Sequence, residues 1–163
     1  MKTDLRDWDG KSTAFLRAVY AARFDWDIAL ALCAQDAVSV GASWLVKHHV
    51  ERSALPTGSV QALLAAQRSA GPRDTLLHLI QALDKVDLGG CDLRHAAGTL
   101  RVTCDHDAPF VRAWSLSAFA RLAAADAAYS AEARQRIEAA LHAGAKPSVA
   151  ARLKIAAKML GQS

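Results

Sequence analysis

Apolar side chains recur along most of the chain at the three-to-four-residue spacing of an amphipathic helix. After Pro109, for example, Val111, Phe119 and Leu122 mark one apolar face. β-branched residues are scattered and nowhere alternate with polar residues over the length of a strand. The pattern therefore predicts an all-α fold of about eight to nine helices. We expect them at residues 11–24, 26–34, 36–50, 57–70, 72–86, 91–104, 109–123, 130–143 and 147–160.

Proline, glycine and serine mark where these helices begin and end. Pro109 suits the first position of a helix, where its missing N–H costs nothing. Ser130 is a suitable N-cap for the helix that it opens, and Gly144 a suitable stop. The pair Gly89-Gly90 is a further helix stop signal.

The helix openings repeat along the chain. Prolines at positions 72, 109 and 147 lie 37 and 38 residues apart. When the apolar faces of these helices are aligned, equivalent positions are occupied by Val40, Thr75, Val111 and Val149, which follow one another at similar spacings. One helical hairpin cannot bury its apolar face alone, so such units are stable when they stack. We expect a single domain, residues 1–163, with repeat-like units at about 36–70, 72–104, 108–143 and 146–160.

The third unit resembles the HEAT-repeat family of α-solenoids. The resemblance lies in a D-x-x-x-P-x-V-R opening, formed by Asp105, Pro109, Val111 and Arg112. It extends to weaker matches around Val40 and around Pro147, and covers residues 36–160 as a pattern. It implies an α–α superhelix of stacked antiparallel helix pairs, in which the second helix of each pair lines a concave face.

Composition and length exclude several classes of protein. No apolar run reaches the roughly 18 residues of a membrane span, so we expect no membrane association. The N-terminal stretch MKTDLRDWDGK has acids where a signal peptide needs an apolar core. The three cysteines are odd in number and far apart, which is typical of a reduced, cytoplasmic compartment.

The excess of positive charge lies in the C-terminal part of the chain. Residues 94–163 hold ten lysines and arginines against five acids, whereas residues 1–93 hold ten against eleven. Superposing the second helices of the pairs aligns polar positions into a candidate basic strip on the concave face. Its members are Gln61, Arg68, Arg94, Arg101, Arg134, Gln135 and His142. Such a strip favours an acidic partner, although a merely solvated face has the same pattern.

Catalytic and cofactor motifs are missing from the sequence, so we assign no catalytic residue and expect no cofactor. The most ligand-like residues are Cys91, His95, Cys104 and His106. The first two could share a helix face, but the other two lie roughly 20 Å along the same helix. One metal ion cannot bridge that distance, so we expect no metal site.

Four tryptophans are the largest side chains in an alanine-rich sequence. Trp44 and Trp114 occupy nearly equivalent repeat positions, where packing between helices is the simplest role. A binding hot spot or a base-stacking platform is the alternative. Trp8 and Trp26 lie where they could cover the first exposed repeat face.

The leading hypothesis from the sequence is a non-catalytic binding or scaffold module for a protein partner. Binding to nucleic acid is the alternative, because HEAT-like repeats also occur in alkylpurine DNA glycosylases. That chemistry would need Trp114, Asp105, Asp107 and Arg112 to converge. A third hypothesis is self-association through the last helix, which would expose Ile155, Met159 and Leu160 if nothing packed there.

Overall fold

The computed structural model describes residues 1–144 and 146–161. Ten α-helices, one 3₁₀ helix and no strand are present in these two ranges, which confirms the predicted all-α class. The α-helices are α1 Lys2–Arg6, α2 Thr13–Arg23, α3 Trp26–Leu32, α4 Asp36–Val50, α5 Thr57–Ala65, α6 Arg73–Leu83, α7 Arg94–Thr103, α8 Pro109–Ala125, α9 Ser130–His142 and α10 Pro147–Leu160. The 3₁₀ helix η1, Ala127–Tyr129, joins α8 to α9.

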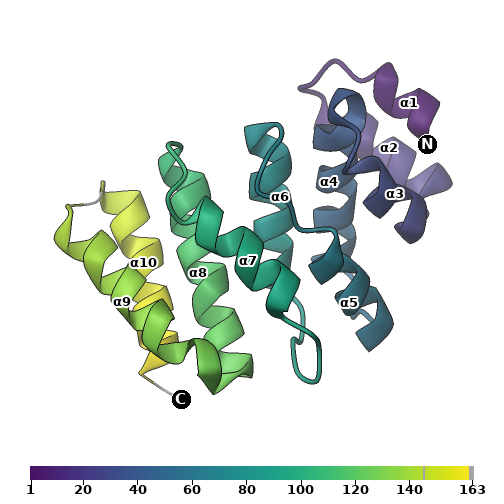
Figure 1. Ribbon diagram of the computed structural model, residues 1–163. Coiled ribbons are helices and arrows are strands. Elements are labelled where there is room, and N and C mark those ends of the chain that lie inside the picture. The colour runs from purple at the N-terminus through teal and green to yellow at the C-terminus, as the bar shows by residue number, and fades with distance from the viewer. Residues whose placement is uncertain (145, 162–163) are drawn as a thin grey trace.

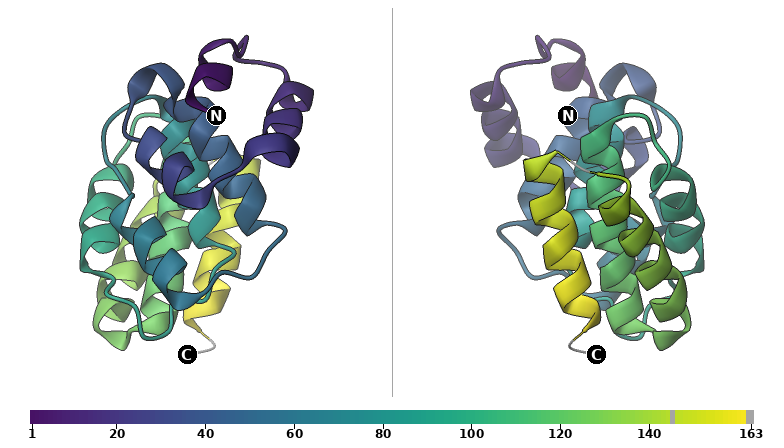
Figure 2. Two further views of the ribbon diagram at one scale, coloured as in Figure 1. Left: turned by 90° about the vertical axis from the view of Figure 1, so that its right-hand side faces the viewer. Right: turned by 90° about the vertical axis from the view of Figure 1, so that its left-hand side faces the viewer.

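The helices form two layers (Figure 1). Helices α4, α6, α8 and α10 lie side by side, and each packs on the next. Helices α5, α7 and α9 lie in front of them, and both end-on views show the same separation into layers (Figure 2). Helices α1, α2 and α3 all pack on α4 at the N-terminal end. Within the ranges given above, no helix is both long and apolar enough to cross a membrane.

Helix α8 lies at the centre of the C-terminal half. It packs on α6, α7, α9 and α10. No residue from Val111 to Ala123 is exposed, and most of this stretch is fully buried. A helix that is buried around its whole circumference must be apolar or small on every side. The sequence of α8 meets that condition with Ala113, Ala118 and Ala120, which allow neighbouring helices to approach closely.

Buried hydroxyl groups join adjacent helices where the core is not wholly apolar. Ser39 Oγ of α4 lies 2.8 Å from Thr75 Oγ1 of α6. Ser115 Oγ of α8 lies 2.8 Å from Thr103 Oγ1 of α7 and from the carbonyl of Val111. These hydrogen bonds satisfy polar groups that would otherwise be costly to bury.

The short helix α1 is an element that the sequence pattern did not predict. Its Leu5 is buried against Gly41 of α4, where an added Cβ would lie 2.9 Å from Leu5 Cδ2. Trp8 packs on the same glycine, and its Nε1 donates to the carbonyl of Ser12. Gly41 therefore makes room for the N-terminal segment on α4. Trp26 also packs against the core.

Several of the expected helix boundaries were wrong. Helix α6 ends at Leu83 rather than residue 86, and α7 begins at Arg94 rather than residue 91. Helix α5 ends at Ala65 rather than residue 70, because the next residues turn inward. There, Gln67 Nε2 donates to the carbonyls of Leu63 and Leu79.

The prediction of Ser130 as an N-cap was also wrong, although α9 does begin at this residue. Tyr129 occupies the N-cap position, and Ser130 Oγ donates back to the carbonyl of Ala123. The preceding 3₁₀ turn is capped instead by Asp126, whose Oδ1 accepts from the N–H of Ala128. By contrast, Ala108 caps α8 and Pro109 is its first residue, as expected.

The apolar residues of the last helix are largely covered. Leu160 is buried and Met159 packs against the core. Ile155, at 52% exposure, is therefore the exposed member of the three. Helices α8 and α9 pack on α10, so its apolar face is buried within the protein without self-association.

Three histidines near α4 are held in their neutral form. Burial lowers the pKa of His48, of His49 and of His78, the last to about 4. His78 Nδ1 lies 3.2 Å from Ser43 Oγ. The ring of His48 stacks on Trp44, with 4.6 Å between the ring centroids. Trp44 therefore has a packing contact of the kind that its repeat position predicted.

These histidines predict a pH-dependent stability. The pKa of His78 is about 4 in the folded protein and 6.5 for the unperturbed group. Between these values the unfolded chain binds more protons, so stability is full above about pH 6.5 and decreases as the pH falls. The contribution of His78 is about 3 kcal/mol. Urea unfolding from pH 7.5 to pH 4 measures this loss. In His78→Asn the free energy of unfolding should depend less on pH over this range. His142→Asn, a substitution at an exposed site, should leave the pH dependence unchanged.

Trp114 predicts a second stability effect. It packs against the core, and the guanidinium carbon of Arg152 lies 3.6 Å from its ring centroid. We expect Trp114→Ala to cost about 3 kcal/mol, the low end for a large buried aromatic side chain, because part of the ring faces solvent. Phe110→Ala on the same helix, at 57% exposure, is the control and should cost less than about 0.5 kcal/mol. Equal losses in urea unfolding would contradict this difference.

Candidate functional site: a groove between helices α8, α9 and α10

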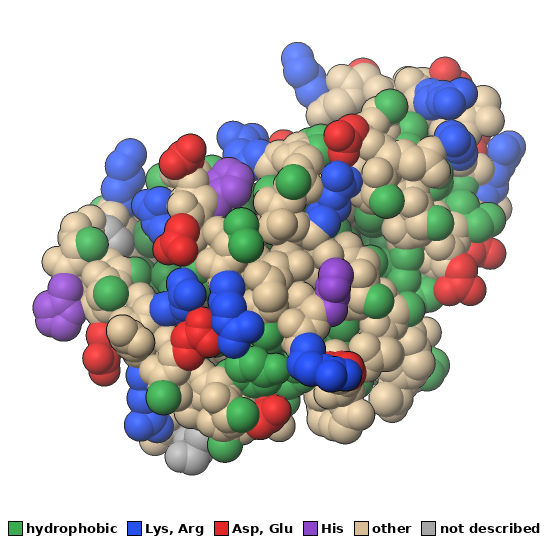
Figure 3. Space-filling model, viewed as in Figure 1, with side chains coloured by type: hydrophobic (Ala, Val, Ile, Leu, Met, Phe, Trp, Pro, Cys, Tyr) green, Lys and Arg blue, Asp and Glu red, His purple; other side chains and the backbone are tan. Residues whose placement is uncertain are grey.

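The arginines of the candidate basic strip are paired within the protein. Arg68 contacts Asp36 at 3.1 Å and donates to the carbonyl of Cys33 at 2.7 Å. Arg94 forms an ion pair with Asp92 at 2.6 Å, and Arg101 one with Glu132 at 2.8 Å. On the face that Figure 3 shows, basic side chains accordingly lie next to acidic ones rather than in one continuous band.

The remaining strip residues have separate surroundings. Gln61 Nε2 donates to the carbonyl of Asp92, and its Oε1 accepts from the N–H of Asp92. Arg134 donates to the carbonyl of Leu160. His142 Nδ1 lies 2.7 Å from the carbonyl oxygen of Glu138. Gln135 is exposed and lines a groove.

This groove is formed by residues of three helices and of the loops beside them. It has a volume of about 1010 Å³ and lies between α8, α9 and α10, beside the end of α7. Its floor consists of small and aliphatic side chains, chiefly Ala113, Leu116, Ala139, Ala140, Val149 and Leu153. Its edges carry the polar residues Asp105, Arg112, Glu132, Gln135, Arg136 and Lys146.

The local sequence of α9 produces this arrangement. Glu132, Arg136 and Ala139 follow one another at helical spacing and, with Gln135, line the groove. Ala133 and Ile137, on the adjacent face, are buried in the core. The same helix therefore anchors the second layer with one face and forms a wall of the groove with the other.

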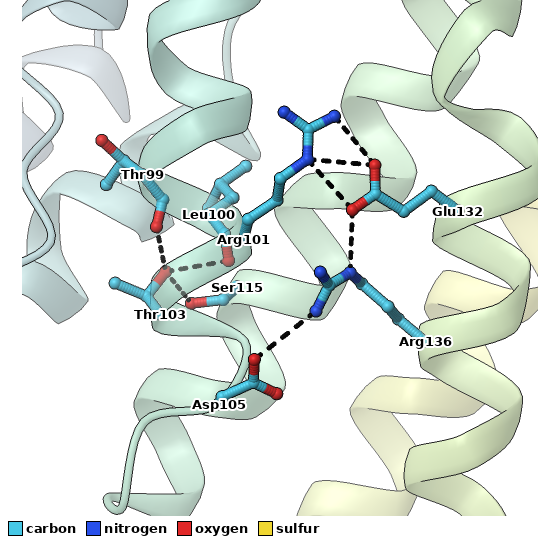
Figure 4. Close-up of polar contacts among 8 residues, drawn as sticks. All are labelled: Thr99, Leu100, Arg101, Thr103, Asp105, Ser115, Glu132 and Arg136. Carbon is cyan, nitrogen blue, oxygen red and sulfur yellow. Dashed lines mark hydrogen bonds and ion pairs between the residues drawn. The ribbon is translucent and has the colours of Figure 1, made fainter.

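A chain of ion pairs runs along one edge of the groove and joins α7 to α9 (Figure 4). Glu132 accepts from Arg101 of α7 through both carboxylate oxygens, at 2.8 to 3.1 Å. It also accepts from Nε of Arg136, one turn further along α9, at 3.0 Å. Arg136 in turn lies 3.6 Å from Asp105, whose side chain is 80% exposed. The guanidinium of Arg101 also lies over the rings of Phe119 and Tyr129.

Two groups in the groove have perturbed pKa values, and neither is suited to catalysis at neutral pH. Hydrogen bonds from Arg101 and Arg136 lower the pKa of Glu132, which stays ionised. Burial raises the pKa of the Cys104 thiol to about 12. A general base needs a pKa near the working pH, and a nucleophilic thiol needs a low one. Neither the Glu132 carboxylate nor the Cys104 thiol meets these requirements.

Two further cations that line the groove, Arg112 and Lys146, lack acidic partners among the described residues. Arg112 donates through Nη1 to the carbonyl of His106. Over the residues that the structure describes, neither Arg112 nor Lys146 forms an ion pair. Arg112 lies in the first turn of α8, and Lys146 immediately precedes α10. The parallel positions of α8 and α10 place both cations at the same end of the groove.

The structure separates the other residues that the sequence singled out. His95 Nε2 lies 2.9 Å from the carbonyl of Gln67, and His106 Nδ1 accepts from the N–H of Ala108. No cluster of three or more potential metal ligands occurs among residues 1–144 and 146–161. Asp105 and Arg112 line the groove, but Trp114 does not. The ring of Trp114 instead makes a cation–π contact with the guanidinium of Arg152.

The network at the groove edge predicts measurable coupling. Arg101 and Glu132 are partly shielded from solvent, so a double-mutant cycle with Arg101→Gln and Glu132→Gln should give about 0.5–1 kcal/mol of coupling in unfolding free energy. The Arg94–Asp92 pair is the control. Its arginine side chain is 86% exposed, so the same cycle should show no measurable coupling. Equal coupling energies in the two pairs would mean that the position of Glu132 between two arginines does not strengthen its ion pair with Arg101.

No family model, curated protein or solved structure matches this chain. The resemblance to HEAT repeats therefore stays a prediction from the sequence. What the molecule binds has to follow from its own groove, charges and contacts.

Proposed function

We propose that the protein is a non-catalytic binding module, a HEAT-like α-solenoid that holds a segment of a protein partner in the groove between α8, α9 and α10. One observation carries the proposal: a concave site with an aliphatic floor and charged edges, set into the two helix layers. Apolar surface in such a site is favourable to bury, and polar edges fix the orientation of what binds there.

The dimensions of the groove support a polypeptide ligand. Its lining residues run from Glu132 of α9 to Ala143 at the C-cap of that helix, which is about 17 Å at 1.5 Å per residue. Its volume, about 1010 Å³, is at the upper limit for typical small-molecule pockets. A site of this length suits a segment with several side chains better than a single metabolite.

The structure lends less support to nucleic-acid binding. A phosphate backbone is bound by cations that release their counterions. Arg68, Arg94 and Arg101 each already pair with an acid of this chain. A phosphate contact there would have to displace Asp36, Asp92 or Glu132.

Filling the groove tests the proposal. Ala139→Trp places a large side chain on an exposed groove position of α9 and should abolish capture of the partner. The control is Ala131→Trp on the same helix, which is exposed and does not line the groove. Affinity capture followed by mass spectrometry compares both variants with the unmodified protein, and circular dichroism verifies their folding.

The two variants give distinct outcomes. A partner retained by Ala131→Trp and lost by Ala139→Trp supports binding in the groove. A partner that both variants retain binds elsewhere, and the groove is then not the recognition site.

A further inference from the structure

We infer that the segment held in the groove is an acidic amphipathic helix, whose carboxylate lies against Arg112 and Lys146. This inference rests on the proposed function and specifies the chemistry of the partner. Two properties of the groove lead to it: the shape of its floor and the balance of charge around its edges.

The floor favours a helix over an extended strand. A peptide that binds as an added β-strand needs backbone partners at a sheet edge, and residues 1–144 and 146–161 contain no strand. A helix satisfies its own backbone hydrogen bonds. Alanines at positions 113, 139 and 140 leave room for a helix to approach closely, as they do in the contacts that α8 makes within the fold.

The length of the groove sets the size of this helix. About 17 Å corresponds to three helical turns. Apolar side chains at positions i, i+3 or i+4, and i+7 of the partner would lie on Leu116, Val149 and Leu153. This is the arrangement in which an amphipathic helix binds an apolar groove.

The charges around the groove favour an acidic partner. The acids Asp105 and Glu132 are both engaged by Arg136, and Glu132 also by Arg101. Arg112 and Lys146 are left over at the end where α8 and α10 begin. Three cations and two carboxylates therefore line the groove, and both carboxylates are already paired with arginines. A carboxylate of the partner would supply the missing negative charge and fix the direction of the bound helix.

A peptide-display library of random 14-residue sequences tests this inference with the full chain as the target. We expect the selected peptides to combine apolar residues at i, i+3 or i+4, and i+7 with Asp or Glu near one end. The double variant Arg112→Gln/Lys146→Gln should weaken their binding roughly tenfold or more, and higher salt should weaken it as well.

A variant of equal charge provides the control. Lys154→Gln/Lys158→Gln removes the same two positive charges from exposed positions of α10 that do not line the groove. It should leave the affinity nearly unchanged. Lys146→Gln alone should still weaken binding, and because Lys146 is exposed and unpaired in the described structure, this variant should fold normally.

The outcomes separate the two proposals. Selected peptides whose binding is blocked by Ala139→Trp bind in the groove. If these peptides lack acidic residues, or bind Arg112→Gln/Lys146→Gln as tightly as the unmodified protein, the inference of an acidic helix is wrong and the groove remains the binding site. Peptides that Ala139→Trp does not block would overturn the proposed function itself. Equal losses in the two charge variants would reduce the effect to net charge and also overturn the inference.

Discussion

The burial of helix α8 on every side is the constraint on which the C-terminal half depends. Because α6, α7, α9 and α10 all pack on α8, each of them is positioned by the same set of small side chains. Leu116 and Ala113 belong to this helix and also form part of the groove floor. The position of the candidate site is thus fixed by the packing of the core rather than by a loop.

Electrostatics then distinguishes one part of the surface from another. Most arginines that the sequence aligned into a strip are neutralised by a nearby acid or bound to a backbone carbonyl. Arg112 and Lys146 line the groove and form no ion pair with any described residue. A net charge of +4 for the whole chain therefore says little about where an anionic group would bind.

The helices could be predicted from the sequence because their signals are local. Pro109 and Pro147 open α8 and α10, as proline in the first turn indicates. The end of α5 could not be predicted, because it depends on Gln67 reaching carbonyls of both α5 and α6. Helix α1 was missed for a similar reason: it owes its position to the space above Gly41, which is far away in the sequence.

The candidate site was only partly accessible to sequence reasoning. Gln135 was identified as a surface position and does line the groove. The pairing of Arg101 with Glu132 joins residues that are 31 positions apart, so helical spacing within one element could not indicate it. The alanines of the floor look like ordinary helix-forming residues in the sequence. Their role depends on how α8, α9 and α10 pack together, which only the tertiary arrangement defines.

The division of α9 into a buried face and a groove face has an evolutionary consequence. Ala133 and Ile137 hold the helix in place, while Gln135, Arg136 and Ala139 line the groove. Since the two sets of positions do not overlap, substitutions can accumulate on the groove face without loosening the core. The same scaffold could thus acquire a different specificity through a few changes along one helix, while the residues that keep it folded stay constant.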